Sequence, residues 1–288
     1  MTGRYWLYRR SIGHQVPIEI SEARYRELAS ARSTLTDAAS FEQKYDLLLG
    51  NYMAFESWAA TYSISVAVTF DHSYDAALKT FGEANRHVMN LLSSARSYID
   101  QVKQDFSHLP LSPPFADQAI AGLSAAYDEC KEYRFLEALR NHVQHYAPPV
   151  HGIAPARQDG DQWAWVESVA FNCLREYLEE NPKFKKSVLA EAAKETELRH
   201  AIRQYVAAIS RTHITLRRAV AVEVEAARLA FTRAIEDFAV LNADGSVGLA
   251  AGIELENGDH ENVVSILLNW DDARLKLAQK NRYPVLTA

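Results

Sequence analysis

The chain has 288 residues, of which 48% are hydrophobic and 24% are charged, with a formal net charge of -6 at pH 7. These values are ordinary for a soluble globular protein, and the length is sufficient to bury a core. The acidic balance argues against binding nucleic acid through overall charge, so such a partner would need a local basic patch. The two cysteines, Cys130 and Cys173, lie in separate segments and form neither a CxxC metal motif nor a disulfide framework.

We expect a cytoplasmic, reducing compartment and no membrane span. Residues 1–15 lack the apolar run of a signal peptide. The most apolar stretch, YSISVAVTF at 62–70, is too short to cross a bilayer.

The first part of the chain predicts an extended arm followed by helices. Residues 1–20 read as extended, and Ser21 can cap a short helix. Ser40 and Gln43 match a capping box, in which each side chain bonds the backbone N–H of the other, so a separate long helix is expected to begin there. Asp71 or Ser73 caps the next helix. The long helix that begins at Ser40 is expected to end near Val68. Two further helices are expected over about 74–105 and about 115–146.

The second part predicts one more long helix and a small β component. QWAWVESVAF at 162–171 is rich in strand-forming residues. A short helix is expected over about 183–193 and a long one over about 196–240. Two apolar runs flank Asn257-Gly258, a dipeptide typical of hairpin turns, and a final helix covers about 271–280.

Long helices with short connections predict a mainly α protein. We expect an antiparallel helical bundle with a small β-hairpin or strand component near the C-terminus. The expected domains are an extended arm with a short helix at 1–35, the helical bundle at 36–239, and an accessory hairpin plus helix at 240–288.

The stretch EALRNHVQHYAPP at 137–149 is the most informative motif in the sequence. At about 100° per residue, a helix over 134–146 separates two faces. The apolar face carries Leu136, Leu139 and Val143. The opposite stripe carries Arg134, Glu137, Asn141 and His145. The helix is expected to end close to His145, because a residue before proline avoids the helical conformation and Ala147 precedes Pro148.

An arginine, a polar residue and a histidine at this spacing resemble the motif of the HEPN superfamily. The match is Arg140, Asn141 and His145. Arg9 and His14 have the same spacing, but Arg10 follows Arg9 and Gly13 disfavours a helix. The resemblance implies a helical bundle, and many members of the superfamily are metal-independent ribonucleases of toxin–antitoxin, antiviral or RNA-processing systems.

The residue types suit cleavage of RNA by its own 2′-OH. Histidine exchanges protons near neutral pH, and arginine offers a fixed charge to phosphate oxygens. We therefore expect Arg140, Asn141 and His145 to be catalytic, without metal or cofactor. Four further residues are expected to bind substrate: Arg134, Glu137, His142 and Arg96.

Less specific interpretations of the motif stay open at this stage. Arg140 can simply pair with Glu137, three positions earlier, while His145 merely ends a helix. His142, His145 and His151 can instead be metal ligands, with Glu137 and Asp159 as the nearest carboxylates.

Other polar groups also have two interpretations. Arg96 and Asp100 either pair on the surface or line a cleft beside the Arg140 helix, together with Asn85, Arg86, Asn90 and Ser93. Three basic groups are either solvated charge or an RNA footprint: Arg4/Arg9/Arg10, Lys183/Lys185/Lys186 and Arg211/Arg217/Arg218. The tryptophans at 163, 165 and 270 are expected to serve packing.

RNA is the expected partner, and a homodimer is the expected assembly. The polar stripe faces away from its own core, and isologous dimers are the commonest oligomers. The resemblance adds an antitoxin-like protein as a further partner. The alternative is a non-catalytic helical module that binds a protein or nucleotide partner.

Overall fold

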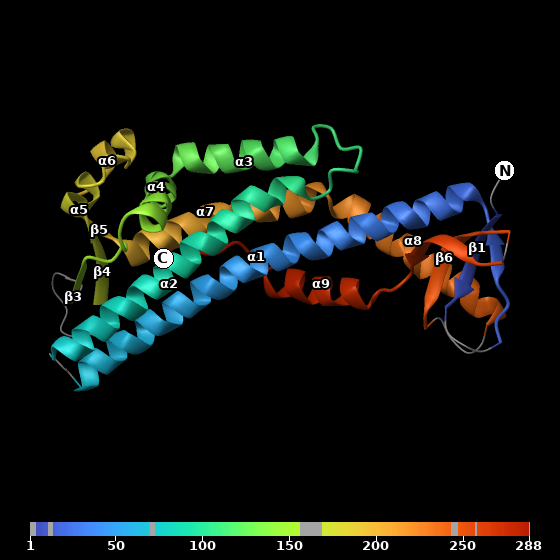
Figure 1. Ribbon diagram of the computed structural model, residues 1–288, viewed down its shortest axis with the longest axis horizontal. Coiled ribbons are helices and arrows are strands. Elements are labelled where there is room, and N and C mark those ends of the chain that lie inside the picture. Colours follow the sequence, from blue (N-terminus) through green and yellow to red (C-terminus); the bar gives the residue numbers. More distant parts are fainter. Residues whose placement is uncertain are drawn as a thin grey trace. The chain divides into compact units, whose positions relative to one another are not determined.

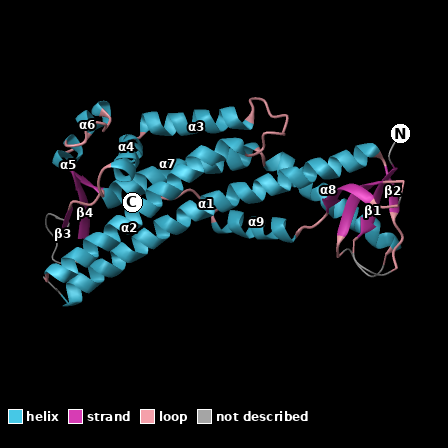
Figure 2. Ribbon diagram, viewed as in Figure 1, coloured by secondary structure: helices cyan, strands magenta, loops and turns pink. Residues whose placement is uncertain are grey.

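The computed structural model describes residues 4–10, 14–69, 73–155, 169–242, 247–256 and 258–287. Most of these residues are helical, and the strands form two small antiparallel sheets (Figures 1 and 2). The predicted mainly α class is therefore confirmed. Among the helices of these ranges, none is both long and apolar enough to cross a membrane.

The chain divides into two compact units. The first comprises Met1–Gln43, Gln104–Ala116 and Thr215–Arg282, and the second comprises Lys44–Lys103, Asp117–Ile214 and Tyr283–Ala288. Three of the described α-helices contribute residues to both units: α1 (Glu22–Thr69), α3 (Phe115–Glu129) and α7 (Leu198–Ala219).

The first unit contains a four-stranded sheet with the order β2-β1-β6-β7. Its strands are β1 (Arg4–Arg9), β2 (Ile18–Ile20), β6 (Leu249–Glu254) and β7 (His260–Ser265). The N-terminal arm is thus extended, as predicted, because it pairs with the C-terminal hairpin. Gly258 has a φ of 83° in the β6–β7 connection, a conformation that glycine adopts without strain.

Helices α8 (Ala221–Leu241) and α9 (Asn269–Lys280) complete the first unit. Phe41, Phe106 and Phe115 form an aromatic cluster with ring centroids 5.0–5.9 Å apart. Asp271, whose side chain is 1% exposed, is held by Arg228 and Arg274. A buried carboxylate needs such partners, because burial without them is costly.

The second unit contains the remaining helices and a three-stranded sheet with the order β3-β4-β5. The helices are α2 (Tyr74–Gln101), the 3₁₀ turn η1 (Val102–Gln104), α3 (Phe115–Glu129), α4 (Lys131–His145), α5 (Arg175–Glu179) and α6 (Lys186–Glu191). The strands are β3 (Gly152–Pro155), β4 (Val169–Leu174) and β5 (Glu195–Glu197). Helices α1, α2 and α7 meet in the core through Tyr45, Tyr98 and His213, where His213 stacks on Tyr45 at 3.8 Å.

Three predicted helix boundaries are wrong. Ser40 does not start a helix, since α1 runs without a break from Glu22 through a stretch that contains neither proline nor glycine before Gly50. The expected helix over 115–146 is two helices that meet at Cys130, which has an extended conformation. The expected helix over 196–240 divides at the buried Val220. No proline or glycine marks either break, so local propensity does not reveal them.

Two other predictions fall partly or wholly on residues outside the described ranges. Strand β4 begins at Val169, near the end of the predicted strand at 162–171. Trp163, Trp165 and Asp159 lie outside the ranges described.

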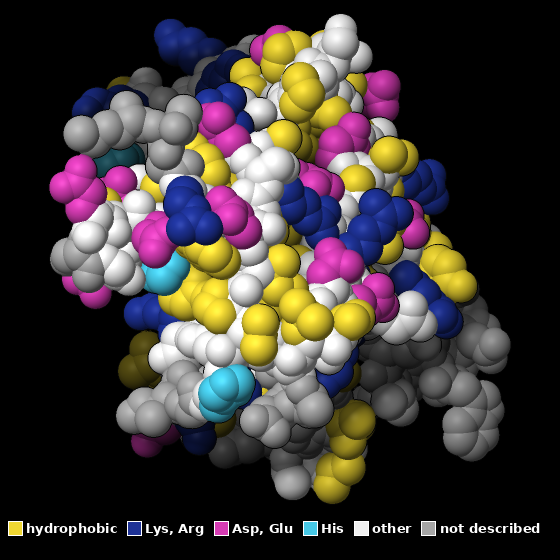
Figure 3. All heavy atoms as spheres, turned by 90° about the vertical axis from the view of Figure 1, so that its right-hand side faces the viewer, with side chains coloured by type: hydrophobic (Ala, Val, Ile, Leu, Met, Phe, Trp, Pro, Cys, Tyr) yellow, Lys and Arg dark blue, Asp and Glu magenta, His cyan; other side chains and the backbone are white. Residues whose placement is uncertain are grey.

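Charges of both signs are interspersed on the face drawn in Figure 3, with hydrophobic side chains between them. This agrees with the net charge of -6 and with the expectation that an anionic partner needs a local cluster of cations.

Candidate functional site

Helix α4 carries the motif and ends where the sequence predicts. It covers Lys131–His145, and the N–H of Tyr146 closes its last turn by donating to the carbonyl of His142. Leu136 and Leu139 are fully buried, as expected for the apolar face, whereas Val143 is half-buried. The apolar face of the helix is therefore packed in the core, and only part of its opposite side is exposed.

Arg140, Asn141 and His145 lie on the outward part of α4. Asn141 and His145 are exposed, and Arg140 is half-buried. The Arg140 Nη1 donates to the Asn141 Oδ1 over 3.0 Å. The Arg140 Nε is buried and has no hydrogen-bond partner among the described atoms. No hydrogen bond among the described residues joins Arg140 to His145, so their predicted approach and their catalytic role stay predictions.

Glu137 points away from Arg140 toward the interior of the second unit. Its Oε1 accepts a hydrogen bond from the Tyr205 hydroxyl at 2.6 Å, and its Oε2 accepts one from Arg96 at 3.1 Å. Burial, followed by the charge of Glu137, raises the pKa of Tyr205 well above its usual value, so this hydroxyl stays protonated and donates. The alternative in which Arg140 pairs with Glu137 therefore finds no support in the described contacts.

Arg96 joins helix α2 to helix α4. It forms the expected surface pair with Asp100, four residues later, and it also reaches Glu137. Asn85, nearer the N-terminus of α2, accepts the N–H of Val150 through its Oδ1 at 2.9 Å. Part of the polar stripe of α2 thus lies beside α4 and the segment that follows it, although these contacts are structural.

Arg134 caps the preceding helix. Its Nη1 donates to the carbonyls of Tyr127 and Asp128, in the last turn of α3, over 3.1 and 2.6 Å. Its other nitrogens bind Glu191. These contacts occupy the guanidinium, and the proposed role of Arg134 in substrate binding remains a prediction.

His142 is buried, and its hydrogen bonds define its tautomer. The Oδ1 of Asn181 accepts the N–H of Lys183 at 3.0 Å, which leaves the Nδ2 of Asn181 to donate to the His142 Nδ1 at 3.0 Å. The neutral ring then carries its proton on Nε2, which is buried without a partner among the described atoms. Burial, together with the charge of His151, lowers the pKa of His142, so the ring is neutral near pH 7.

His151 has the same arrangement. Its Nδ1 accepts the backbone N–H of Leu174 at 3.1 Å, so the neutral ring is again protonated on Nε2. A protonated Nε2 offers no lone pair to a metal ion, and a three-histidine site would have to break both Nδ1 hydrogen bonds. Within the described ranges, no group of three or more histidine, cysteine or acidic side chains is placed to hold a metal.

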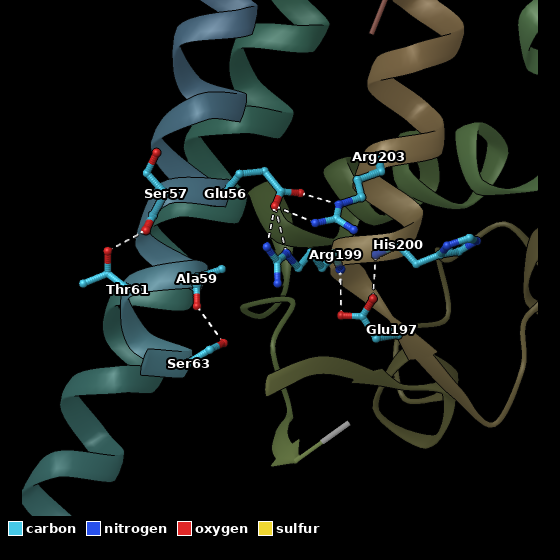
Figure 4. Close-up of polar contacts among 9 residues, drawn as sticks. All are labelled: Glu56, Ser57, Ala59, Thr61, Ser63, Glu197, Arg199, His200 and Arg203. Carbon is cyan, nitrogen blue, oxygen red and sulfur yellow. Dashed lines mark hydrogen bonds and ion pairs between the residues drawn. The ribbon is translucent and has the colours of Figure 1, made fainter. Parts of the chain in front are cut away.

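A second polar cluster in this unit was not anticipated from the sequence. Glu56 of α1 accepts hydrogen bonds from Arg199 and Arg203 of α7 over 2.7–2.9 Å, as Figure 4 shows. Burial alone would raise the pKa of Glu56, but the two arginines outweigh it and lower the pKa. The i, i+4 spacing of the arginines was the only local signal, because their partner is more than 140 positions away in the chain.

Comparison with known proteins gives no relative from which a role can be transferred. No protein-family model, no curated protein and no solved structure matches this chain. The link to the HEPN superfamily therefore depends on the Arg140–His145 motif and its helical setting.

Proposed function

We propose that this chain is a metal-independent endoribonuclease of the HEPN type, with Arg140, Asn141 and His145 as its catalytic residues. The motif ends an amphipathic helix whose apolar face is buried, and its polar side chains are at least partly accessible. Accessible placement at a helix end suits a site that must admit a polymer.

The observation that carries the proposal is the state of the Arg140 guanidinium. Its one described partner is the neutral amide of Asn141, while the nearest acidic residue of its own helix, Glu137, is committed to Arg96 and Tyr205. Because no carboxylate among the described residues neutralises it, the positive charge of the Arg140 guanidinium remains available to a phosphate.

The proposed reaction needs one proton acceptor and one proton donor. A base removes the proton of the 2′-OH, the 2′-oxygen forms a bond to the adjacent phosphorus, and the bond from phosphorus to the 5′-oxygen breaks. An acid then protonates the departing 5′-oxygen, which leaves a 2′,3′-cyclic phosphate and a 5′-hydroxyl. Histidine suits both tasks, and Arg140 stabilises the negative charge that grows on the phosphate oxygens.

Cleavage of a labelled single-stranded RNA in EDTA tests this proposal. We expect cyclic-phosphate products from the wild type and their loss in Arg140→Ala and in His145→Ala. Arg26→Ala and His200→Ala remove an exposed arginine and an exposed histidine elsewhere and are expected to retain activity. Activity that survives His145→Ala, or that disappears with EDTA, would contradict the proposal.

A purified protein that binds RNA without cutting it would instead be the non-catalytic module. In the toxin interpretation, expression of the wild type arrests growth and His145→Ala does not. A small protein that relieves the arrest would be the antitoxin-like partner.

A further inference from the structure

The end of helix α4 is bound to the segment 180–186, which runs from the end of α5 to the first residue of α6. The Tyr146 hydroxyl donates to the carbonyl of Glu180 over 3.0 Å, and Asn181 donates to the buried His142. Phe184 is buried with its ring centroid 5.9 Å from that of His142. These contacts hold the segment beside the helix end that carries Arg140 and His145.

The segment 180–186 carries three lysines around its buried phenylalanine. Lys183, Lys185 and Lys186 are all exposed. Lys185 donates to the Tyr127 hydroxyl over 2.6 Å, which fixes its ammonium group without neutralising it. Lys183 and Lys186 form no ion pair with any residue of the described ranges.

Each of the other two basic groups includes an arginine that is paired with a carboxylate. Arg4 is paired with Glu19, and Arg217 is bound by both oxygens of Glu42. Near the lysine segment, Glu179 is bound by Arg175, although Glu180 remains exposed. The lysines therefore provide local positive charge on an otherwise acidic chain.

Tyr146 adds an aromatic ring that is bound to the same segment. It follows His145 directly, and it is 50% exposed. Its hydroxyl is bound to the carbonyl of Glu180, and its ring centroid is 5.1 Å from that of His142. The hydroxyl and the ring of Tyr146 are thus both held in place. A base that stacks on the exposed face of the ring therefore does not lose binding free energy by immobilising the side chain.

We propose that Tyr146, Lys183 and Lys186 form a binding surface for single-stranded RNA, with a base stacked on Tyr146 and neighbouring phosphates on the two lysines. This inference rests on the proposed ribonuclease function and names the groups that hold the strand next to the scissile phosphate. An aromatic ring beside cations is the usual combination for single strands, since the bases of a duplex are already stacked on one another.

The salt dependence of binding tests the lysines. The probe is a fluorescent 2′-O-methylated RNA oligonucleotide, which cannot be cleaved because its 2′-oxygen carries no proton. Each phosphate contact on a single strand contributes about 0.7 to the slope of log K against log salt, so Lys183→Gln/Lys186→Gln should lower the slope by about 1.4. The matched control is Lys79→Gln/Lys103→Gln, which removes two exposed lysines from the same unit and should leave the slope unchanged.

The ring of Tyr146 is tested with two substitutions. Tyr146→Leu removes the stacking surface and should weaken binding about ten-fold. Tyr146→Phe keeps the ring and should retain most of the affinity. The same oligonucleotide in duplex form should bind more weakly than the single strand.

The outcomes separate this surface from the ribonuclease proposal. The proposed binding surface is wrong, and the ribonuclease proposal stands, if the wild type cuts RNA and either of two results is found. One is that Lys183→Gln/Lys186→Gln has the same salt slope as the wild type, and the other is that Tyr146→Leu has the same affinity for the probe. If the wild type binds the probe and the double lysine variant shows the lower salt slope, but the wild type does not cut RNA, the ribonuclease proposal is wrong. Equal binding of duplex and single strand would also overturn the stacking role.

Discussion

At the scale of single residues, Glu137 shows how one carboxylate changes the interpretation of a motif. On a helical wheel it belongs to the same outward stripe as Asn141 and His145. In the structure it is only 15% exposed and binds Tyr205 and Arg96. The contact with a buried tyrosine gives Glu137 a structural role and leaves Arg140 without an acidic partner.

Loss of the Glu137 carboxylate should therefore cost much more stability than loss of the Asp100 carboxylate, which also binds Arg96. Glu137→Ala leaves the fully buried Tyr205 hydroxyl without an acceptor, and we expect the free energy of unfolding to fall by about 1–3 kcal/mol. Asp100→Ala removes an exposed i, i+4 partner of Arg96 and should cost about 0.3–0.5 kcal/mol. Urea denaturation of both variants measures the difference, and equal losses would show that the Tyr205 contact contributes nothing.

The buried His142 and the half-buried His151 should make stability depend on pH. The pKa values of His142 and His151 are both lowered from the ordinary value of 6.5, mainly by burial. Below that value the unfolded chain binds protons that the folded chain does not, so stability rises with pH across this window and falls on acidification. The melting temperature should accordingly drop between about pH 7.5 and about pH 5.5.

His142→Gln isolates one of these groups. The variant should show a shallower dependence of melting temperature on pH, although it is less stable at neutral pH. His200→Gln, which changes an exposed histidine, should keep the dependence of the wild type. If His142→Gln leaves the dependence of melting temperature on pH unchanged, other groups titrate in this pH window.

At the scale of elements, the N-terminus of α2 and the middle of α1 offer a direct comparison of two serines. Ser73, one of the two caps predicted from the sequence, accepts the N–H of Ala76 through its hydroxyl and caps α2. Ser40 also looked like a cap but lies inside α1. Ser73→Ala should cost about 0.5–2 kcal/mol, whereas Ser40→Ala should be nearly neutral, since alanine favours the middle of a helix. Thermal unfolding distinguishes them, and similar losses would contradict the assignment.

Features that depend on local geometry could be predicted from the sequence, and features that depend on tertiary packing could not. Periodicity and proline placement located the buried Leu136 and Leu139 and the end of α4 at His145, because these depend on local geometry. The breaks at Cys130 and Val220 carry no proline or glycine and depend on packing. The partners of Glu137, His142 and Glu56 could not be predicted either, because each lies on a different element far along the chain.

At the scale of the whole molecule, the proposed chemistry asks for more than one chain offers. Cleavage needs a base on one side of the phosphorus and an acid on the other, while the motif supplies one accessible histidine, His145. A second copy related by a two-fold axis would supply the other histidine and a second Arg140. We therefore expect a homodimer in which residues 134–151 of both copies line a shared cleft.

Mixing the wild type with an inactive variant tests the shared cleft. When His145→Ala exchanges subunits with the wild type at equal concentrations, mixed dimers are about half of the population at random pairing. Each mixed dimer has a single His145, so a cleft that needs one histidine from each copy is inactive there, and activity should fall to about half of that of the same amount of wild type alone. Light scattering at micromolar concentration gives the mass in parallel. A monomer of 32.4 kDa that cuts RNA, or activity that does not change on subunit exchange, would mean that each chain contains its own complete site.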